Sequence, residues 1–181
     1  MKNLSFTLLF VLIFCFFNSA SLFSQDDGWE EVSYKTGEKP NCISSAEKFD
    51  YKTEDFLRIL LGRNTNVVIK VHNTVNDECI RCVFINAGES FEINNIPEGI
   101  YYLKIAFGNF WMQKEFGGQK CEGKFQQEVY YKKGDKLLDF NTVKTETGVK
   151  IPNFELKLEI FKKNKKNEYK SSQITEEEFL K

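Results

Sequence analysis

The sequence contains little histidine, proline and methionine, with one, three and two residues of these types among 181. A single histidine removes most routes to a histidine-ligated metal site, and it leaves His72 as the only imidazole that could act as a base. The low proline content, with only 11 glycines, excludes collagen-like and proline-rich disordered chains. Hydrophobic residues make up 41% of the chain, which is enough for one ordinary globular domain.

The chain also lacks an excess of charge of either sign. It has 25 basic and 26 acidic side chains, which gives a formal net charge of -1. Nucleic-acid-binding domains usually carry a clear positive excess that holds the phosphate backbone. We therefore expect no nucleic-acid partner.

Long hydrophobic runs are absent except at the N-terminus. There a positively charged start precedes an unbroken apolar run over residues 8–17, and small or polar residues follow up to Ser24. This order is typical of a secretory signal peptide, and the run is shorter than the roughly 20 residues of a membrane-spanning helix. We expect residues 1–24 to be removed and the protein to be secreted or periplasmic, without a permanent membrane span. An uncleaved anchor and a lipoprotein are the alternatives, and the bulky Phe14 before Cys15 argues against the lipoprotein.

Removal of the leader leaves four cysteines: Cys42, Cys79, Cys82 and Cys121. An even number in an exported protein favours disulfides, and four cysteines allow three pairings that the sequence does not separate. We expect long-range bridges. Cys79 and Cys82 are three positions apart in an extended segment, so they should face opposite sides of the sheet. The same geometry argues against a redox-active pair and against a zinc site, and we expect no metal and no cofactor.

Residues 25–55 are polar, without hydrophobic periodicity, and predict an irregular N-terminal arm that Cys42 can pin to the body. Residues 56–161 hold the segments with β character, which are 56–61, 67–72, 79–85, 90–94, 101–107, 125–131, 137–143 and 154–161. A short helix is the alternative for the first of them. Seven or eight short strands separated by turn signals predict an all-β fold, an antiparallel β-sandwich. No amphipathic segment is long enough for a βαβ crossover, which disfavours a parallel α/β sheet.

Residues 162–181 predict a polar tail that ends in a short helix. Four lysines within residues 162–166 indicate a solvated linker, with contact to an acidic surface as the alternative. Thr175 and Glu178 have the spacing of a capping box, and Ile174 and Phe179 have that of a hydrophobic staple. We therefore expect one or two helical turns docked on the domain.

One hairpin carries a family resemblance. Within residues 66–107, a β-run and a turn precede Ile96, Pro97, Gly99 and Tyr101, an apolar residue followed by the pattern Pro-x-Gly-x-Tyr. This stretch, about a quarter of the chain, resembles carboxypeptidase regulatory-like, or prealbumin-like, domains, which are seven-stranded sandwiches. The resemblance implies that Ile96 closes the core, that Gly99 takes the turn and that Tyr101 begins an inward-facing strand. The mature chain as a whole is also similar to small secreted bacterial proteins, which implies no activity.

The sequence holds no recognisable catalytic motif. His72 lies in a predicted strand without a GxSxG elbow, and we expect it on the surface. Neighbouring carboxylates, such as Glu30 and Glu31, are typical of solvated arms, and no phosphate-binding glycine loop or calcium loop is present. We therefore expect a protein that is not an enzyme.

Aromatic residues are dense in the second half of the chain. They are Phe107, Phe110, Trp111, Phe116, Tyr130 and Tyr131. Most should fill the core, but Phe110 and Trp111 follow a predicted turn at Gly108 and Asn109, and neighbouring strand residues do not both face inward. Exposed aromatic rings suit recognition of a protein or a glycan. The candidate ligand-binding residues are therefore Phe110, Trp111 and Tyr130.

Together these features predict a non-enzymatic exported binding module that acts at the cell envelope or outside the cell. Its expected partner is a protein or glycan at the cell surface. A structural accessory domain is the first alternative, and a secreted hydrolase or inhibitor is the second.

Overall fold

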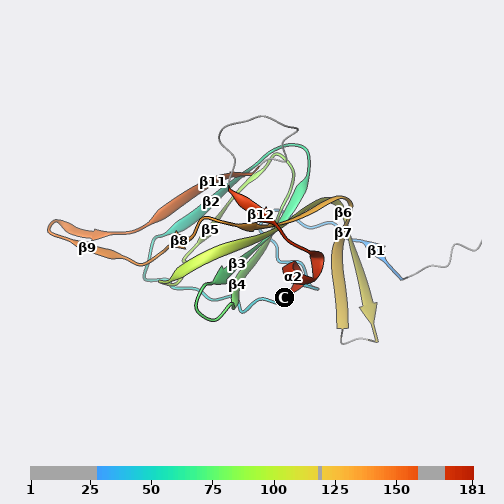
Figure 1. Ribbon diagram of the computed structural model, residues 1–181, viewed down its shortest axis with the longest axis horizontal. Coiled ribbons are helices and arrows are strands. Elements are labelled where there is room, and N and C mark those ends of the chain that lie inside the picture. Colours follow the sequence, from blue (N-terminus) through green and yellow to red (C-terminus); the bar gives the residue numbers. More distant parts are fainter. Residues whose placement is uncertain (1–27, 118–119, 159–169) are drawn as a thin grey trace, which may run out of the picture.

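A computed structural model describes residues 28–117, 120–158 and 170–181 of the chain. These residues form an all-β fold of mainly antiparallel sheets with one short C-terminal helix (Figure 1), which confirms the predicted fold class. The predicted signal peptide and the lysines of residues 162–166 lie outside the described residues. None of the helical structure in the described ranges has the length and apolar character that a membrane crossing requires.

The larger sheet has the strand order β12-β7-β6-β3-β4, with β1 and β8 also paired to β6. Its strands are β1 (Glu30–Glu31), β3 (Asn66–Asn73), β4 (Cys79–Ile85), β6 (Ile100–Phe116), β7 (Lys120–Gly134), β8 (Leu138–Asp139) and β12 (Ser171–Gln173). The strands β6 and β7 are much longer than the sequence pattern predicted, and the far end of their hairpin turns away from the body (Figure 1).

The smaller sheet has the order β11-β2-β5, and its strands are β2 (Phe56–Leu61), β5 (Ser90–Asn94) and β11 (Asn153–Leu158). The pair β2 and β11 is parallel, which departs from the purely antiparallel sandwich that we expected. A separate hairpin of β9 (Val143–Thr145) and β10 (Gly148–Lys150) projects from the body (Figure 1). The predicted strand 137–143 is only partly formed, because β8 covers Leu138–Asp139 and β9 begins at Val143. Residues 159–161 of the last predicted strand lie outside the described residues.

The main core lies between the two sheets. The smaller sheet contributes alternate residues of β2, with Leu57 and Ile59 at 0% exposure, and the larger sheet contributes Leu103 and Ile105 of β6, also at 0%. This alternation confirms the strand assignments for residues 56–61 and 101–107, and it excludes the helical alternative for the first.

A second core covers the opposite face of the larger sheet. It contains Val68, Phe84 and Phe179, together with Ile43 of the N-terminal arm. The strand β3 is consequently buried on both faces, whereas its alternation predicted one solvent-exposed face. The physical reason is that the N-terminal arm and the C-terminal helix pack on the face of the larger sheet that points away from the main core.

The C-terminal helix α2 (Glu176–Leu180) forms as its capping signals predicted. The Oγ1 atom of Thr175 accepts a hydrogen bond from the backbone N–H of Glu178 at 3.2 Å. Phe179 is 1% exposed and docks the helix on the second core.

The Pro-Glu-Gly hairpin before β6 has the geometry that the sequence implied. Ile96 and Tyr101 are 0% and 1% exposed, and the Tyr101 hydroxyl donates to the carbonyl oxygen of Pro97 at 2.8 Å. Gly99 has a φ of 154°. A Cβ atom at this position would lie 3.0 Å from the Tyr101 hydroxyl oxygen, so the hairpin requires glycine here.

The N-terminal arm runs along the edge of β4. The N–H of Gly37 donates to the carbonyl of Phe84, and the N–H of Ala46 donates to that of Cys79, both at 2.8 Å. Apart from β1, the arm has no strand or helix among its described residues. Its backbone bonds cover an edge that would otherwise offer unpaired groups to another chain.

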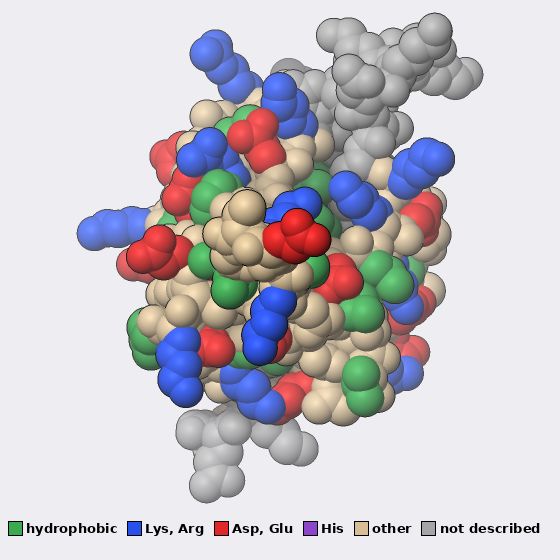
Figure 2. Space-filling model, turned by 90° about the vertical axis from the view of Figure 1, so that its left-hand side faces the viewer, with side chains coloured by type: hydrophobic (Ala, Val, Ile, Leu, Met, Phe, Trp, Pro, Cys, Tyr) green, Lys and Arg blue, Asp and Glu red, His purple; other side chains and the backbone are tan. Residues whose placement is uncertain are grey.

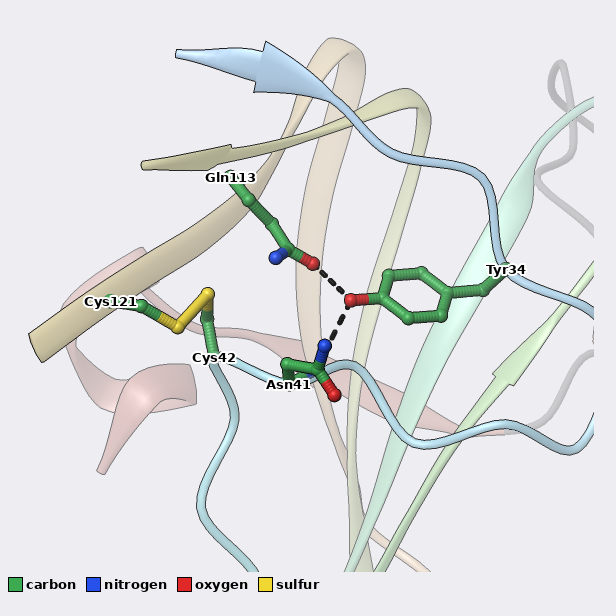
Figure 3. Close-up of a disulfide and its surroundings, with 5 residues drawn as sticks. All are labelled: Tyr34, Asn41, Cys42, Gln113 and Cys121. Carbon is green, nitrogen blue, oxygen red and sulfur yellow. Dashed lines mark hydrogen bonds between the residues drawn. A yellow bond between two sulfur atoms is a disulfide. The ribbon is translucent and has the colours of Figure 1, made fainter. Parts of the chain in front are cut away.

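One long-range disulfide, between Cys42 and Cys121, joins the arm to β7 (Figure 3). Beside it, the Tyr34 hydroxyl donates to Gln113 and accepts a hydrogen bond from the backbone N–H of Asn41 at 3.1 Å. Close approach of the arm depends on Gly123, because a Cβ there would lie 2.6 Å from the Trp111 ring and 3.2 Å from the Cys42 Cβ. The bridge confirms that Cys42 pins the arm to the body.

Candidate functional site

Trp111 is buried, so the prediction that its ring is exposed is wrong. Its side chain is 2% exposed and packs edge-on against Phe125, with ring centroids 5.0 Å apart, and against Phe84 at 6.4 Å. The predicted turn at Gly108 and Asn109 is also wrong, because β6 continues through both residues.

A β-bulge explains the orientation of the neighbouring Phe110. The register between β6 and β7 shifts between Phe107 and Asn109, and both Phe110 and Glu128 have positive φ angles, of 55° and 51°. Phe110 points outward and is 44% exposed, while the third predicted residue, Tyr130, is 47% exposed. Neither residue lines the pocket described next.

The larger sheet carries an open pocket of about 560 Å³ at the end of β6 and β7. We call it the Tyr102 pocket, and its lining includes Thr74, Tyr102, Lys133, Asp135, Leu137 and Ser172. These residues come from the β3–β4 loop, β6, β7, the β7–β8 connection and β12. The pocket therefore combines three residues that carry hydroxyl groups, one cation, one carboxylate and a small apolar wall.

A different face lies at the end of the molecule that carries β9. Figure 2 shows that basic and acidic side chains are interspersed on this face and that hydrophobic side chains form small separate groups. Val143 and Val149 of the β9–β10 hairpin are exposed hydrophobic residues. Broad apolar patches usually mark interaction surfaces, so a concave polar pocket is the better candidate.

Tyr102 is held in place by groups on three sides. Its hydroxyl donates to Asp77 Oδ1, its ring stacks on His72 with centroids 5.3 Å apart, and Lys133 Nζ lies 4.4 Å from its ring centroid. Burial and the Asp77 carboxylate raise the pKa of Tyr102, while the hydrogen bond from Tyr102 lowers the pKa of Asp77. At neutral pH the phenol therefore donates and the carboxylate accepts.

His72 is fully buried, so the prediction of a surface histidine is wrong. Its Nδ1 lies 3.0 Å from the carbonyl oxygen of Asp77, and because that oxygen only accepts, Nδ1 carries the hydrogen. Burial lowers the pKa of His72 from 6.5 to about 4, so the ring is neutral at pH 7. The second nitrogen, Nε2, is buried without a hydrogen-bond partner among the described residues. The ring positions Tyr102 from behind and does not reach the pocket.

The burial of His72 predicts a pH-dependent stability. Its folded pKa of about 4 lies below the ordinary value of 6.5, so the unfolded chain binds the proton more readily. The stabilisation is complete above pH 6.5 and is lost as the pH falls toward 4, which is about 2 kcal/mol between pH 7 and pH 5. Urea unfolding of the wild type and of His72→Gln at both pH values measures this contribution. Equal pH dependence in the two proteins would contradict it.

Cys79 and Cys82 lie on the same face of β4, which corrects the predicted opposed orientation. Val71 pairs with Arg81 and His72 pairs with Cys79, so Ile80 is an extra residue that shifts the alternation. Both cysteines are buried thiols, so two of the four cysteines form a bridge and not all four as we expected. Burial raises the pKa of Cys79 to about 11 and also raises that of Cys82, which keeps both thiols protonated.

The described residues contain no cluster of three or more histidine, cysteine, aspartate or glutamate side chains suited to a metal ion.

Sequence reasoning missed Tyr102, Lys133 and Ser172 as site residues. A signal was present, because Lys70 and His72 of one strand and Tyr102 and Lys104 of another are polar residues at positions where alternation places them on one face. Polar side chains repeated on one face of several strands indicate either solvent or a site.

Comparison with family models, with curated proteins and with solved structures gave no match in any of the three searches. The chain is a mostly-β protein with several antiparallel sheets.

Proposed function

We propose that the protein is a non-enzymatic exported binding module that takes a saccharide in the Tyr102 pocket. The observation that carries the proposal is the composition of this open pocket, whose lining combines the hydroxyl-bearing residues Thr74 and Ser172 with Lys133 and Asp135. Small polar ligands are held in concave sites by a few placed polar groups beside an apolar wall, which Leu137 and Tyr102 provide here. A sugar offers both hydroxyl groups and apolar C–H faces to such a site.

Two features support binding over catalysis. The only imidazole is buried behind Tyr102, away from the pocket, and the two free thiols in the described chain are buried with raised pKa values. General-base and nucleophilic catalysis both require the reacting group to reach the substrate.

Action at the cell envelope or outside the cell is part of the same proposal. It is supported by the N-terminal pattern of the sequence and by the Cys42–Cys121 disulfide, because structural disulfides persist mainly in oxidising compartments. We also assign the sandwich to the carboxypeptidase regulatory-like type as a proposal. Its support is the hairpin in which Ile96 and Tyr101 are buried on either side of Gly99.

A second candidate function is protein recognition through the outward-facing aromatic residues. Phe110 and Tyr130 are 44% and 47% exposed, and exposed rings are frequent anchors in protein interfaces. A purely structural accessory role is the remaining alternative, and it requires neither the pocket nor these rings.

The proposal is tested by filling the pocket. Ser172→Phe places a ring in the pocket and should weaken saccharide binding at least tenfold in a glycan-array and calorimetric assay. Ser33→Phe, an exposed position in the arm, is the matched control and should bind as the wild type does. If the wild type binds no saccharide, or if both variants bind equally well, the pocket is not a saccharide site. Protein capture that Phe110→Ala abolishes would favour the second candidate.

A further inference from the structure

We propose that the Tyr102 pocket selects an anionic group, a carboxylate, sulfate or phosphate, through a row of three lysines. The inference deepens the saccharide-binding proposal and rests on it. Its basis is the alignment of Lys70, Lys104 and Lys133, of which the last lines the pocket.

The three lysines lie side by side across three strands of the larger sheet. Lys70 of β3 is the direct partner of Lys104 in β6, and Lys104 is the direct partner of Lys133 in β7. Directly paired residues of neighbouring strands share a face, so the three side chains emerge on the same side as Tyr102. Like charges in directly opposed positions destabilise a sheet, and this row contains two such pairs.

Burial increases the free-energy cost of placing these like charges side by side. Lys70 and Lys104 are 1% and 3% exposed, and burial lowers the pKa of Lys70, with the charge of Lys104 acting in the same direction. The ammonium group of Lys70 donates to the carbonyl oxygens of Phe179 at 2.9 Å and Leu180 at 3.3 Å. The charge of Lys104 acts on both Lys70 and Asp77, and no ion pair joins Lys104 to a carboxylate among the described residues. A cation without a counterion is stabilised by an added anion.

The carboxylates near the lysine row do not neutralise Lys104 or Lys133 by direct ion pairs. Asp77 already accepts from the Tyr102 hydroxyl, and its pKa is lowered chiefly by that bond, with Lys104 and Lys133 contributing. Glu176 and Glu178 of α2 face Tyr131 and Tyr102, and Asp135 lies in the pocket lining. None of these carboxylates forms an ion pair with Lys104 or Lys133 among the described residues. Lys133 lines the pocket and can contact a ligand directly, whereas Lys104 is buried outside the lining and acts on a ligand through its charge.

The test compares ligands that differ only in charge. Calorimetry at low salt measures binding of a neutral saccharide, of its uronate or sulfated counterpart, and of inorganic sulfate alone. We expect the anionic saccharide to bind at least tenfold more tightly than the neutral one, and this advantage to shrink as salt is added. Lys133→Met should remove the advantage, whereas Lys144→Met, on the exposed β9 strand, should retain it.

The outcomes separate this inference from the function on which it rests. Equal binding of neutral and anionic saccharides, insensitive to Lys133→Met, overturns the anion selectivity and leaves saccharide binding intact. Binding of sulfate that depends on Lys133, without any saccharide binding, supports the anion site and overturns the saccharide function. Binding of neither class overturns both.

Lys104→Met provides a readout that a purely structural lysine would not give. An apolar side chain of similar length removes a buried charge, so we expect a melting temperature at least as high as that of the wild type. The same variant should bind the anionic saccharide several-fold more weakly. A lower melting temperature together with unchanged binding would show that Lys104 serves folding alone and would overturn its role in the site.

Discussion

Replacing Cys42 and Cys121 together with serine should lower the free energy of unfolding by about 4 kcal/mol. The bridge spans a sequence separation of 79 residues, so it removes much of the conformational freedom of the unfolded chain. It also holds the arm against β7, where Tyr34 and Gln113 are hydrogen-bonded. Urea unfolding of the double variant and of the wild type measures the loss.

Reduction of the wild type provides the matched control for this variant. The reduced wild type should unfold at the same urea concentration as the double variant, because both lack the same bond. The amide of Phe84, which donates to Glu38 of the arm at 2.8 Å, should also exchange its hydrogen faster in both. A loss of less than about 1 kcal/mol would mean that the arm is held by its backbone bonds and not by the disulfide.

Trp111→Ala should destabilise the protein by about 4 kcal/mol and leave ligand binding intact at temperatures where the variant is folded. The ring is 2% exposed and contributes to the second core through Phe125 and Phe84. Its removal leaves a cavity in the second core, because Gly123 of β7 packs against this ring and Cys42 of the arm lies beside Gly123. Thermal and urea unfolding measure the stability, and calorimetry measures the binding.

Phe110→Ala is the matched comparison, because the two aromatic residues are neighbours on one strand. Phe110 is 44% exposed, so its replacement should change the free energy of unfolding by no more than about 0.5 kcal/mol. If the neighbouring Trp111→Ala variant instead kept its stability and lost saccharide binding, Trp111 would belong to a binding site and its packing role would be wrong.

Local signals in the sequence predicted much of the fold. The alternation in residues 56–61 and 101–107 placed Leu57, Ile59, Leu103 and Ile105 in the core, since each strand exposes alternate residues to opposite faces. The cap at Thr175 predicted α2 for a similarly local reason, because a cap joins residues three positions apart.

The candidate site was not predictable in the same way. Alternation indicates that Phe110 and Trp111 face opposite sides, but it does not indicate which side the chain covers. The arm covers the side of Trp111, and its contact near Cys42 involves residues about 70 positions away in sequence. The prediction for Trp111 was wrong because burial on that face is a property of the assembled layers.

The orientation of Cys79 and Cys82 depended on a single irregularity. Counting alternate positions places residues three apart on opposite faces, and the extra residue Ile80 reverses that result. A bulge is defined by the pairing of two strands, so neither strand alone reveals it. The same pairing aligns Lys70, Lys104 and Lys133, which come from three separate segments.

By itself, the sequence determined most of the extended segments, the hairpin turn before β6 and the start of the short helix, because these properties depend on residues a few positions apart. Only the tertiary structure decided the strand order, the parallel pairing of β2 with β11 and the pairing of Cys42 with Cys121. It also decided that the arm and α2 cover the face of the larger sheet that lies away from the main core. Those features depend on which distant segments meet. The side-chain pattern of one strand does not indicate which strand pairs with it or which segment covers it.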